Sequence, residues 1–285
     1  DQPPEWTHPP AATHRLRVTT FNAENLFNGT ASGFSTSRGA RSAREWSQQR
    51  QKVAQALLAL DSDVLLLQEV EHDRGRAPEV LPEMLTTLNA LGERAYKAIA
   101  PSVRAGDDAI TNAFLYDPAR VTPVGDVQRI ESKPRPALVQ TFERADGSVF
   151  HLINVHMKSR GRGCRETCAE DRAAELASVL TWFDTHQTDD PWILGGDFNT
   201  LTHEPLWDPL LNNNWARAET NAPTYWFRGQ PQQIDHFWLR NFSSAPEAWV
   251  QPGYAEMPPM AFTHPLYDVD TPRGASDHNP VILEW

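Results

Sequence analysis

Residues 64–67 are four consecutive apolar residues, Val-Leu-Leu-Leu, and they limit the folds open to this chain. A strand with one wet face alternates apolar and polar residues, whereas a strand covered on both faces is apolar throughout. Residues 192–194, Trp-Ile-Leu, repeat the pattern. Both segments therefore predict strands that lie between other layers of the protein.

Amphipathic helices alternate with further apolar segments. Trp46, Val53, Leu57 and Leu60 fall on one face of a predicted helix that ends at Asp61. Further helices are predicted over residues 80–91 and 170–183, and further strands over residues 16–21, 110–116, 137–142, 149–155, 234–239 and 280–285. Many strands with few helices, and no repeat period, indicate sheets packed face to face with helices outside.

Segments without periodicity divide the chain. Residues 1–14 are rich in proline and predict an N-terminal arm, which leaves residues 15–285 as one domain. Residues 28–44 are polar and predict a surface loop. Residues 243–274 combine proline with aromatic side chains and predict a long ordered loop of functional use.

The charge balance bears on possible partners. Lys and Arg total 26 against 37 Asp and Glu, a formal net charge of −11. No basic field is present to hold a polyanion tightly, although a nuclease that releases its product needs only a local metal and a few arginines. No apolar run reaches the ~18 residues of a membrane span. The first residues, from Asp1, fit a processed chain and a trimmed one equally. We also expect a monomer without a stable protein partner.

The two cysteines, Cys164 and Cys168, stand in a glycine-rich polar stretch. A local disulfide is the favoured interpretation, and it would place the protein in an oxidising compartment, secreted or periplasmic. Two free thiols, or half of a metal site, are the alternatives. A closed zinc site would need histidine partners at a spacing that the neighbouring sequence does not offer.

Polar side chains stand at or just after the ends of the apolar strands. A lone Asp in such a place is usually a cap or turn residue, but here the pattern recurs. The set comprises Asn22, Glu24, Glu69, Asn154, His156, Asp197, Asn199, Asp235, Asp277 and His278. Side chains at strand ends can meet in one cleft, so the set predicts a shared site.

Taken in order, these residues resemble the endonuclease/exonuclease/phosphatase (DNase I-like) superfamily over residues 17–285. Gly-Asp-Phe-Asn at 196–199 and Ser-Asp-His-Asn-Pro-Val at 276–281 are the most specific marks. The segments 106–110, 121–125, 135–142 and 154–159 are similar to secreted bacterial nucleases. The resemblance implies an α+β fold, a four-layer α/β-sandwich of two mixed β-sheets, and metal-assisted hydrolysis of phosphodiesters.

Phosphodiester hydrolysis needs a cation beside the non-bridging oxygens, and Mg²⁺ prefers oxygen ligands. Glu69 is expected as the primary metal ligand, with Asn22 and Asp277 assisting; Mn²⁺ or Ca²⁺ are alternatives to Mg²⁺. Asp197 is expected to orient the attacking water, and Asn199 to donate to the phosphoryl group.

Two histidines are expected to flank the phosphate. His278 would be oriented by Asp235, and His156 needs a carboxylate of its own. In pancreatic-type members of the superfamily that partner lies where this chain has Ile110, so Asp108, two residues earlier on the same strand face, is the expected substitute. Arg135 is expected to contact the phosphate, as an alternative to a surface ion pair.

The leading functional hypothesis is a secreted metal-dependent nuclease of DNA and possibly RNA. The first alternative is a phospholipid (sphingomyelinase-like) or small-molecule phosphodiesterase or phosphatase on the same scaffold. Aromatic residues between Trp249 and Tyr267 suit either class, because they stack on bases or enter lipid interfaces. The non-enzymatic alternative is a binding module that has lost catalysis.

Overall fold

A computed structural model describes residues 15–31, 33–72, 79–101, 108–160, 168–220, 222–255 and 267–285. The predicted arm, residues 1–14, lies outside these ranges. Cys164 also lies outside them, so its pairing with Cys168 stays a prediction. Among the helices of the described ranges, none is long and apolar enough to cross a membrane.

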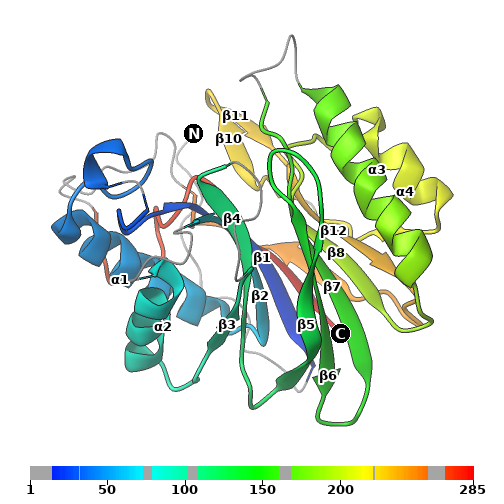
Figure 1. The fold of residues 1–285 in the computed structure, drawn as a ribbon, viewed down its shortest axis with the longest axis horizontal. Helices are drawn as coiled ribbons and strands as arrows, with labels where there is room; N and C mark the ends of the chain where they lie inside the picture. Colours follow the sequence, from blue (N-terminus) through cyan, green and yellow to red (C-terminus); the bar gives the residue numbers. More distant parts are fainter. Residues whose placement is uncertain are drawn as a thin grey trace.

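The strands form two six-stranded sheets and a separate hairpin (Figure 1). The first sheet has the order β13 (Glu247–Val250), β14 (Val281–Glu284), β1 (Arg17–Leu26), β2 (Val64–Glu71), β4 (Ile110–Tyr116), β3 (Lys97–Ile99). The second has the order β5 (Val121–Ile130), β6 (Ala137–Arg144), β7 (Val149–His156), β8 (Trp192–Asp197), β12 (Asp235–Arg240), β9 (Ala216–Arg217). The hairpin pairs β10 (Tyr225–Phe227) with β11 (Gln230–Gln232).

Each sheet is mixed, as predicted. β1 and β2 run parallel in the first sheet, and β7 and β8 run parallel in the second. The other pairings in both sheets are antiparallel. Parallel neighbours require crossover connections, and the helices after β1 and β7 supply them.

The apolar run in β2 is buried on both faces, which confirms the interpretation of residues 64–67. Val64 and Leu66 pack between the sheets, with Ile193 of β8. Leu65 and Leu67 pack on the other face, below the helices. The alternation follows from the pleat of a strand, whose successive side chains point to opposite faces.

Helices cover the outer face of each sheet (Figure 1). The first sheet is covered by α1 (Ala43–Leu60) and α2 (Val80–Leu91), and the second by α3 (Ala169–His186) and α4 (Asp208–Asn212). Single 3₁₀ turns, η1 (Phe34–Thr36) and η2 (Pro205–Trp207), lie in the connections. The result is the four-layer α/β-sandwich that the sequence predicted.

Six of the described strands were not predicted from the sequence: the edge strands β3, β5, β9 and β13, and the two hairpin strands β10 and β11. β5 is an edge strand with mostly exposed residues and a break in its register between Val124 and Gln128, near Gly125 at φ 70°. Such a strand carries little apolar periodicity. The predicted loop over residues 243–274 is also corrected, because residues 247–250 form β13.

His236 lies buried in the second sheet beside Trp207 and Phe198. Its Nε2 donates to the carbonyl oxygen of Thr200 at 3.2 Å. Burial lowers the pKa of His236 to about 4, against ~6.5 in an unfolded chain. Between these values the unfolded chain binds more protons, so His236 destabilises the fold as the pH falls.

Replacing His236 by glutamine, which retains a donor for Thr200, tests this linkage. We compare how much the free energy of unfolding falls from about pH 7.5 to about pH 4.5. The fall is expected to be about 2–3 kcal/mol larger in the wild type than in the variant. Above the unfolded pKa the ring is neutral in both states and has no linked effect. Urea unfolding of both proteins at the two pH values measures the difference, and equal falls would contradict it.

Candidate active site

The two parallel strand pairs bring polar side chains to one end of the sandwich. Asn22 ends the continuous pairing of β1 with β2, opposite Gln68, and Glu69 lies near the end of β2. His156 ends β7 and Asp197 ends β8, directly opposite each other in the register. The Asn22 amide nitrogen donates to the Asp197 carboxylate at 3.1 Å, which joins the two sheets at the site.

Two glycines place Asp197 at this end of β8. Gly196 has φ 145°, and a Cβ there would lie 1.9 Å from the carbonyl oxygen of Val155 in β7. A Cβ on Gly195 would lie 2.4 Å from the ring of Phe237 in β12. The Gly-Gly-Asp sequence therefore lets β8 lie close to both neighbouring strands, which holds the Asp197 carboxylate in a fixed position.

Four residues at the site adopt left-handed backbone conformations that side chains disfavour. They are Glu24, Asn25, Glu69 and Asn199, with φ of 48°, 50°, 62° and 51°. Each such residue costs of order 1–3 kcal/mol, and clusters of them are typical of functional sites. The Asn25 backbone N–H donates to Glu69 at 2.9 Å, which holds that carboxylate in place.

Asp197 is the centre of the site's hydrogen bonds. One oxygen accepts from the Asn199 backbone N–H at 2.8 Å, and the other accepts from Asn22. His156 Nε2 lies 3.5 Å and His278 Nε2 3.9 Å from the second oxygen. Burial, followed by the negative charge of Asp235, raises the pKa of Asp197 to about 7. A carboxylate with such a pKa is well suited to accept a proton near neutral pH.

Three carboxylates near Asp197, those of Glu69, Asp277 and Glu24, are close enough to repel one another electrostatically. Burial, followed by the charge of Asp277, raises the pKa of Glu69. Burial, followed by Asp277 and Glu69, raises the pKa of Glu24 well above its usual value. Mutual repulsion of buried carboxylates is relieved by a hard cation, and an all-oxygen ligand set is the one that Mg²⁺ prefers. The residues present therefore fit a divalent cation.

Among the described residues, the ligand atoms that converge to within 4.8 Å of one another belong to Asp197, Asp235 and His278, which could also hold a cation. His278 Nδ1, however, lies 2.8 Å from Asp235, so these two side chains already satisfy each other. A cation bound by Glu69 and its neighbouring carboxylates would not have to displace a histidine–aspartate contact. We therefore favour these carboxylates as the cation site.

The environments of the two histidines separate their charge states. Burial alone would lower the pKa of His278, but Asp235 and Asp277 raise it well above its usual value. Burial, followed by the positive charges of Arg135 and His278, lowers the pKa of His156 well below its usual value. The surroundings thus favour the charged form of His278 and the neutral form of His156, and such a separation indicates different tasks in acid–base chemistry.

The structure contradicts the predicted partner of His156. Asp108 accepts from Arg135 at 2.5 Å and from Arg38 at 2.9 Å. The Nδ1 atom of His156 has no hydrogen-bond partner among the described residues. Asp108 lies two residues before β4 begins at Ile110, so the alternation of side chains along the strand does not govern its direction.

Arg135 is also placed differently from the sequence prediction. It is 6% exposed, and its guanidinium donates to the backbone carbonyls of His156 and Met157. It therefore binds the protein's own backbone where the sequence predicted a phosphate contact. Asn199 likewise donates to the Met157 carbonyl, at 3.1 Å, although its amide nitrogen keeps a second hydrogen.

A cavity of about 180 Å³ opens over these residues. Its lining includes Tyr225 and Phe227 of the β10–β11 hairpin, which the sequence analysis did not single out. The Tyr225 ring lies 4.8 Å from the His278 ring. Arg160 lines the same cavity and pairs with Glu204. No periodic pattern identifies this hairpin, because its residues are partly exposed on both faces.

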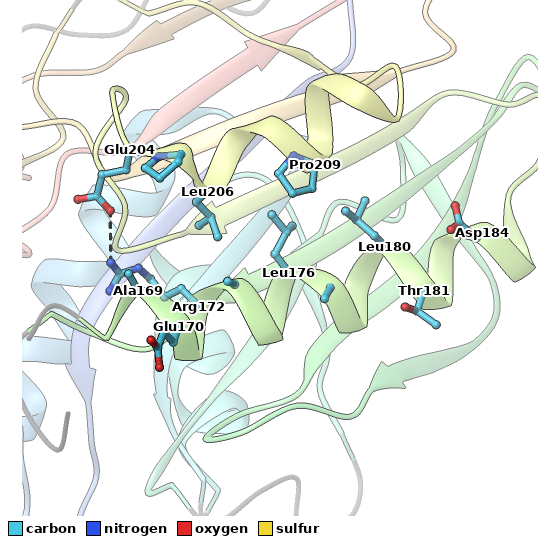
Figure 2. A pocket seen from close by; sticks show the side chains of 13 residues that line it. Ala169, Glu170, Arg172, Leu176, Leu180, Thr181, Asp184, Glu204, Leu206 and Pro209 are labelled. Atoms are coloured by element: carbon cyan, nitrogen blue, oxygen red, sulfur yellow. Dashed lines mark hydrogen bonds and ion pairs between the residues drawn. The ribbon is translucent and has the colours of Figure 1, made fainter. Parts of the chain in front are cut away.

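A larger hollow of about 500 Å³ lies between α3 and the η2–α4 segment (Figure 2). Leu176, Leu180 and Leu206 line it, and the Arg172–Glu204 ion pair closes one end. It holds none of the strand-end residues and lacks their chemistry. The smaller cavity is therefore the candidate active site.

A sequence profile of the Endonuclease/Exonuclease/phosphatase family matches residues 19–278. The chain belongs to this family. Members of the family are hydrolases of phosphate esters and phosphodiesters, and they generally depend on divalent metals. The match spans the candidate active site from Asn22 to His278.

Relatives in the family share the fold at low sequence identity. Nocturnin of Drosophila melanogaster is 23% identical over 180 residues, which cover 60% of this chain and 27% of that protein. A mannosyl-6-phosphatase of Bacteroides thetaiotaomicron has a TM-score of 0.63 at 19% identity, covering 94% of this chain and 98% of that one. D. rerio TDP2 complexed with a single-strand DNA product has a TM-score of 0.61 at 13% identity, covering 95% and 99%.

The chain thus spans about a quarter of the length of the curated Nocturnin, and half of Protein angel, a second Drosophila melanogaster protein that is 24% identical over 191 residues. Both a phosphatase and a DNA-bound protein are among the structural neighbours. At these identities the neighbours show the fold and leave the choice of substrate to the site.

Proposed function

We propose that this protein is a divalent-metal-dependent phosphodiesterase that hydrolyses nucleic acid. One observation carries the proposal: the buried Asp197 carboxylate lies 3.5 Å from Nε2 of His156 and 3.9 Å from Nε2 of His278, beside a group of carboxylates that repel one another. This set offers a proton acceptor, two hydrogen-bond donors and a cation site within one cavity. Together these are the parts that phosphoryl transfer with water requires.

The proposed roles follow from these positions. Asp197 accepts the proton of the attacking water, and Asn22 and the Asn199 backbone hold the carboxylate in place. His156 and His278 donate hydrogen bonds to the phosphoryl oxygens, where negative charge develops. Glu69, Asp277 and Asn22 would hold the cation, which, when bound, offsets the charge of the phosphate.

Two features of the cavity support an oligonucleotide substrate. Arg160 lines the cavity as one partner of an ion pair with Glu204, and its guanidinium could contact the next phosphate of a chain. Phe227 is 49% exposed at the same rim, and aromatic faces stack on bases. A small phosphate ester or a phospholipid headgroup is the alternative, which the phosphatase among the neighbours also suggests.

A single assay series tests the proposal. Supercoiled plasmid, single-stranded DNA, RNA, sphingomyelin, a sugar phosphate and a chromogenic phosphodiester are each incubated with Mg²⁺, Mn²⁺, Ca²⁺ or EDTA. We expect cleavage of nucleic acid with Mg²⁺ or Mn²⁺, and loss of that cleavage in EDTA. Turnover of only the sugar phosphate or sphingomyelin would favour the alternatives, and full activity in EDTA would contradict metal dependence.

Localisation is proposed on separate grounds. A disulfide between Cys164 and Cys168 would indicate an oxidising compartment, and we propose that the protein is secreted or periplasmic. Thiol labelling of the isolated protein without reductant addresses this, since two reactive cysteines would count against it.

A further inference from the structure

The ring of His156 lacks the carboxylate partner that usually orients a catalytic histidine. A catalytic histidine is commonly oriented by a carboxylate bound to its second ring nitrogen. Here Nδ1 of His156 has no hydrogen-bond partner among the described residues. The ring is nevertheless buried, and its Nε2 lies 3.5 Å from Asp197 and 3.9 Å from Glu69, so only the Nδ1 side of the ring lacks a side chain that orients it.

The backbone around His156 is held unusually firmly. Arg135 Nε and Nη2 donate to the His156 carbonyl oxygen at 3.2 and 3.0 Å, and Nη2 also donates to the Met157 carbonyl at 3.0 Å. The next N–H, of Lys158, donates to the buried carboxylate of Glu175 at 3.0 Å. Both the carbonyl oxygens and an N–H of the backbone at the end of β7 are thus held by side chains.

Arg135 is itself prevented from turning away. Its Nη1 lies 2.5 Å from Asp108, which also binds Arg38 at 2.9 Å. Its side chain is 5% exposed, so water has little access to the guanidinium nitrogens and does not compete for their hydrogen bonds. A planar guanidinium can serve two carbonyls and a carboxylate at once, whereas a lysine ammonium cannot hold this geometry.

We infer that Arg135 is a positioning residue, which orients His156 for catalysis by clamping the backbone carbonyls of His156 and Met157. Asp108, in turn, fixes the clamp. Arg135 thus performs through the main chain the orienting task that the carboxylate performs through the ring in pancreatic-type members of the family. The inference rests on the proposed function in one respect, namely that His156 contacts the substrate phosphate.

A mutant cycle between Arg135 and His156 tests the inference. Arg135→Lys keeps the charge but loses the fork, and we expect kcat on the cleaved substrate to fall by ~10²-fold with KM little changed. In the His156→Ala background the same substitution is expected to change kcat by less than about 3-fold, because it acts only through that ring. Arg17→Lys is the matched control, since Arg17 is also buried and also donates to a backbone carbonyl, that of Leu60.

Three results would overturn the inference. Equal losses in both backgrounds would show that Arg135 acts independently of His156, and a raised KM with unchanged kcat would return Arg135 to direct phosphate binding. Crystal structures of wild type and Arg135→Lys give a readout without activity: the ring should leave its place 3.5 Å from Asp197. An inactive wild type would thus refute the proposed function, while an unmoved ring would refute the inference.

Discussion

Replacing Glu69 by glutamine is expected to reduce both metal affinity and kcat by about 10²–10³-fold. The Glu69 carboxylate accepts hydrogen bonds from the Asn22 side chain and the Asn25 backbone N–H, which hold it in place, and the Glu69 backbone has φ 62°. The amide keeps the size of the side chain but removes the charge that a hard cation needs. Calorimetric titration with Mg²⁺ or Mn²⁺, together with rates of nucleic-acid cleavage, measures the two losses.

Glu71→Gln provides the control on the same strand. Glu71 is buried and accepts from the backbone N–H of Asn28 at 2.9 Å, outside the cavity. Its variant should retain metal affinity. If Glu69→Gln bound metal as tightly as the wild type, the cation would have to lie elsewhere, with the Asp197, Asp235 and His278 group as the next candidate.

Loss of His278 is expected to lower kcat by about 10²–10³-fold, the usual effect of deleting a donor to developing negative charge. Asp235→Asn should approach the same loss, because Asp235 lies 2.8 Å from His278 Nδ1 and keeps the ring charged. The double variant should be about as slow as His278→Ala alone, since both changes remove one interaction.

The cycle is measured as kcat and KM in a phosphodiester assay, with His151→Gln as a control histidine. His151 lies at the other end of β7, bound to Thr141. If the losses of kcat in the two single variants multiply in the double variant, Asp235 does not act through His278 and has only a structural role. A rise in KM alone would show that His278 binds substrate without assisting the reaction.

The interior of the fold was predictable because buried helices and strands have characteristic patterns of apolar residues in the sequence. Residues 64–67 and 192–194 could only be central strands, and they became β2 and β8. Edge strands carry no such pattern. β5 has only its two end residues buried, and β13 lies within a segment that reads as a loop.

The strand-end residues were predicted to meet, and the structure brings Asn22, Glu69, His156, Asp197 and His278 together. Their identity followed from motifs next to apolar strands. The contacts of Arg135 and Asp108 did not follow, because they depend on how loops from different strands face each other in space. An arginine reads the same in sequence whether it binds a phosphate or a carbonyl.

The position of β14 sets when such a site can exist during synthesis. β14 pairs with both β1 and β13, and Asp277 and His278 immediately precede it. A nascent chain at ~5–20 residues per second therefore waits about 10–60 s after β1 before its partner emerges. Until then the cation group lacks Asp277 and the acid–base pair lacks His278. A chain of this topology therefore completes its candidate active site only when its last strand has been synthesised.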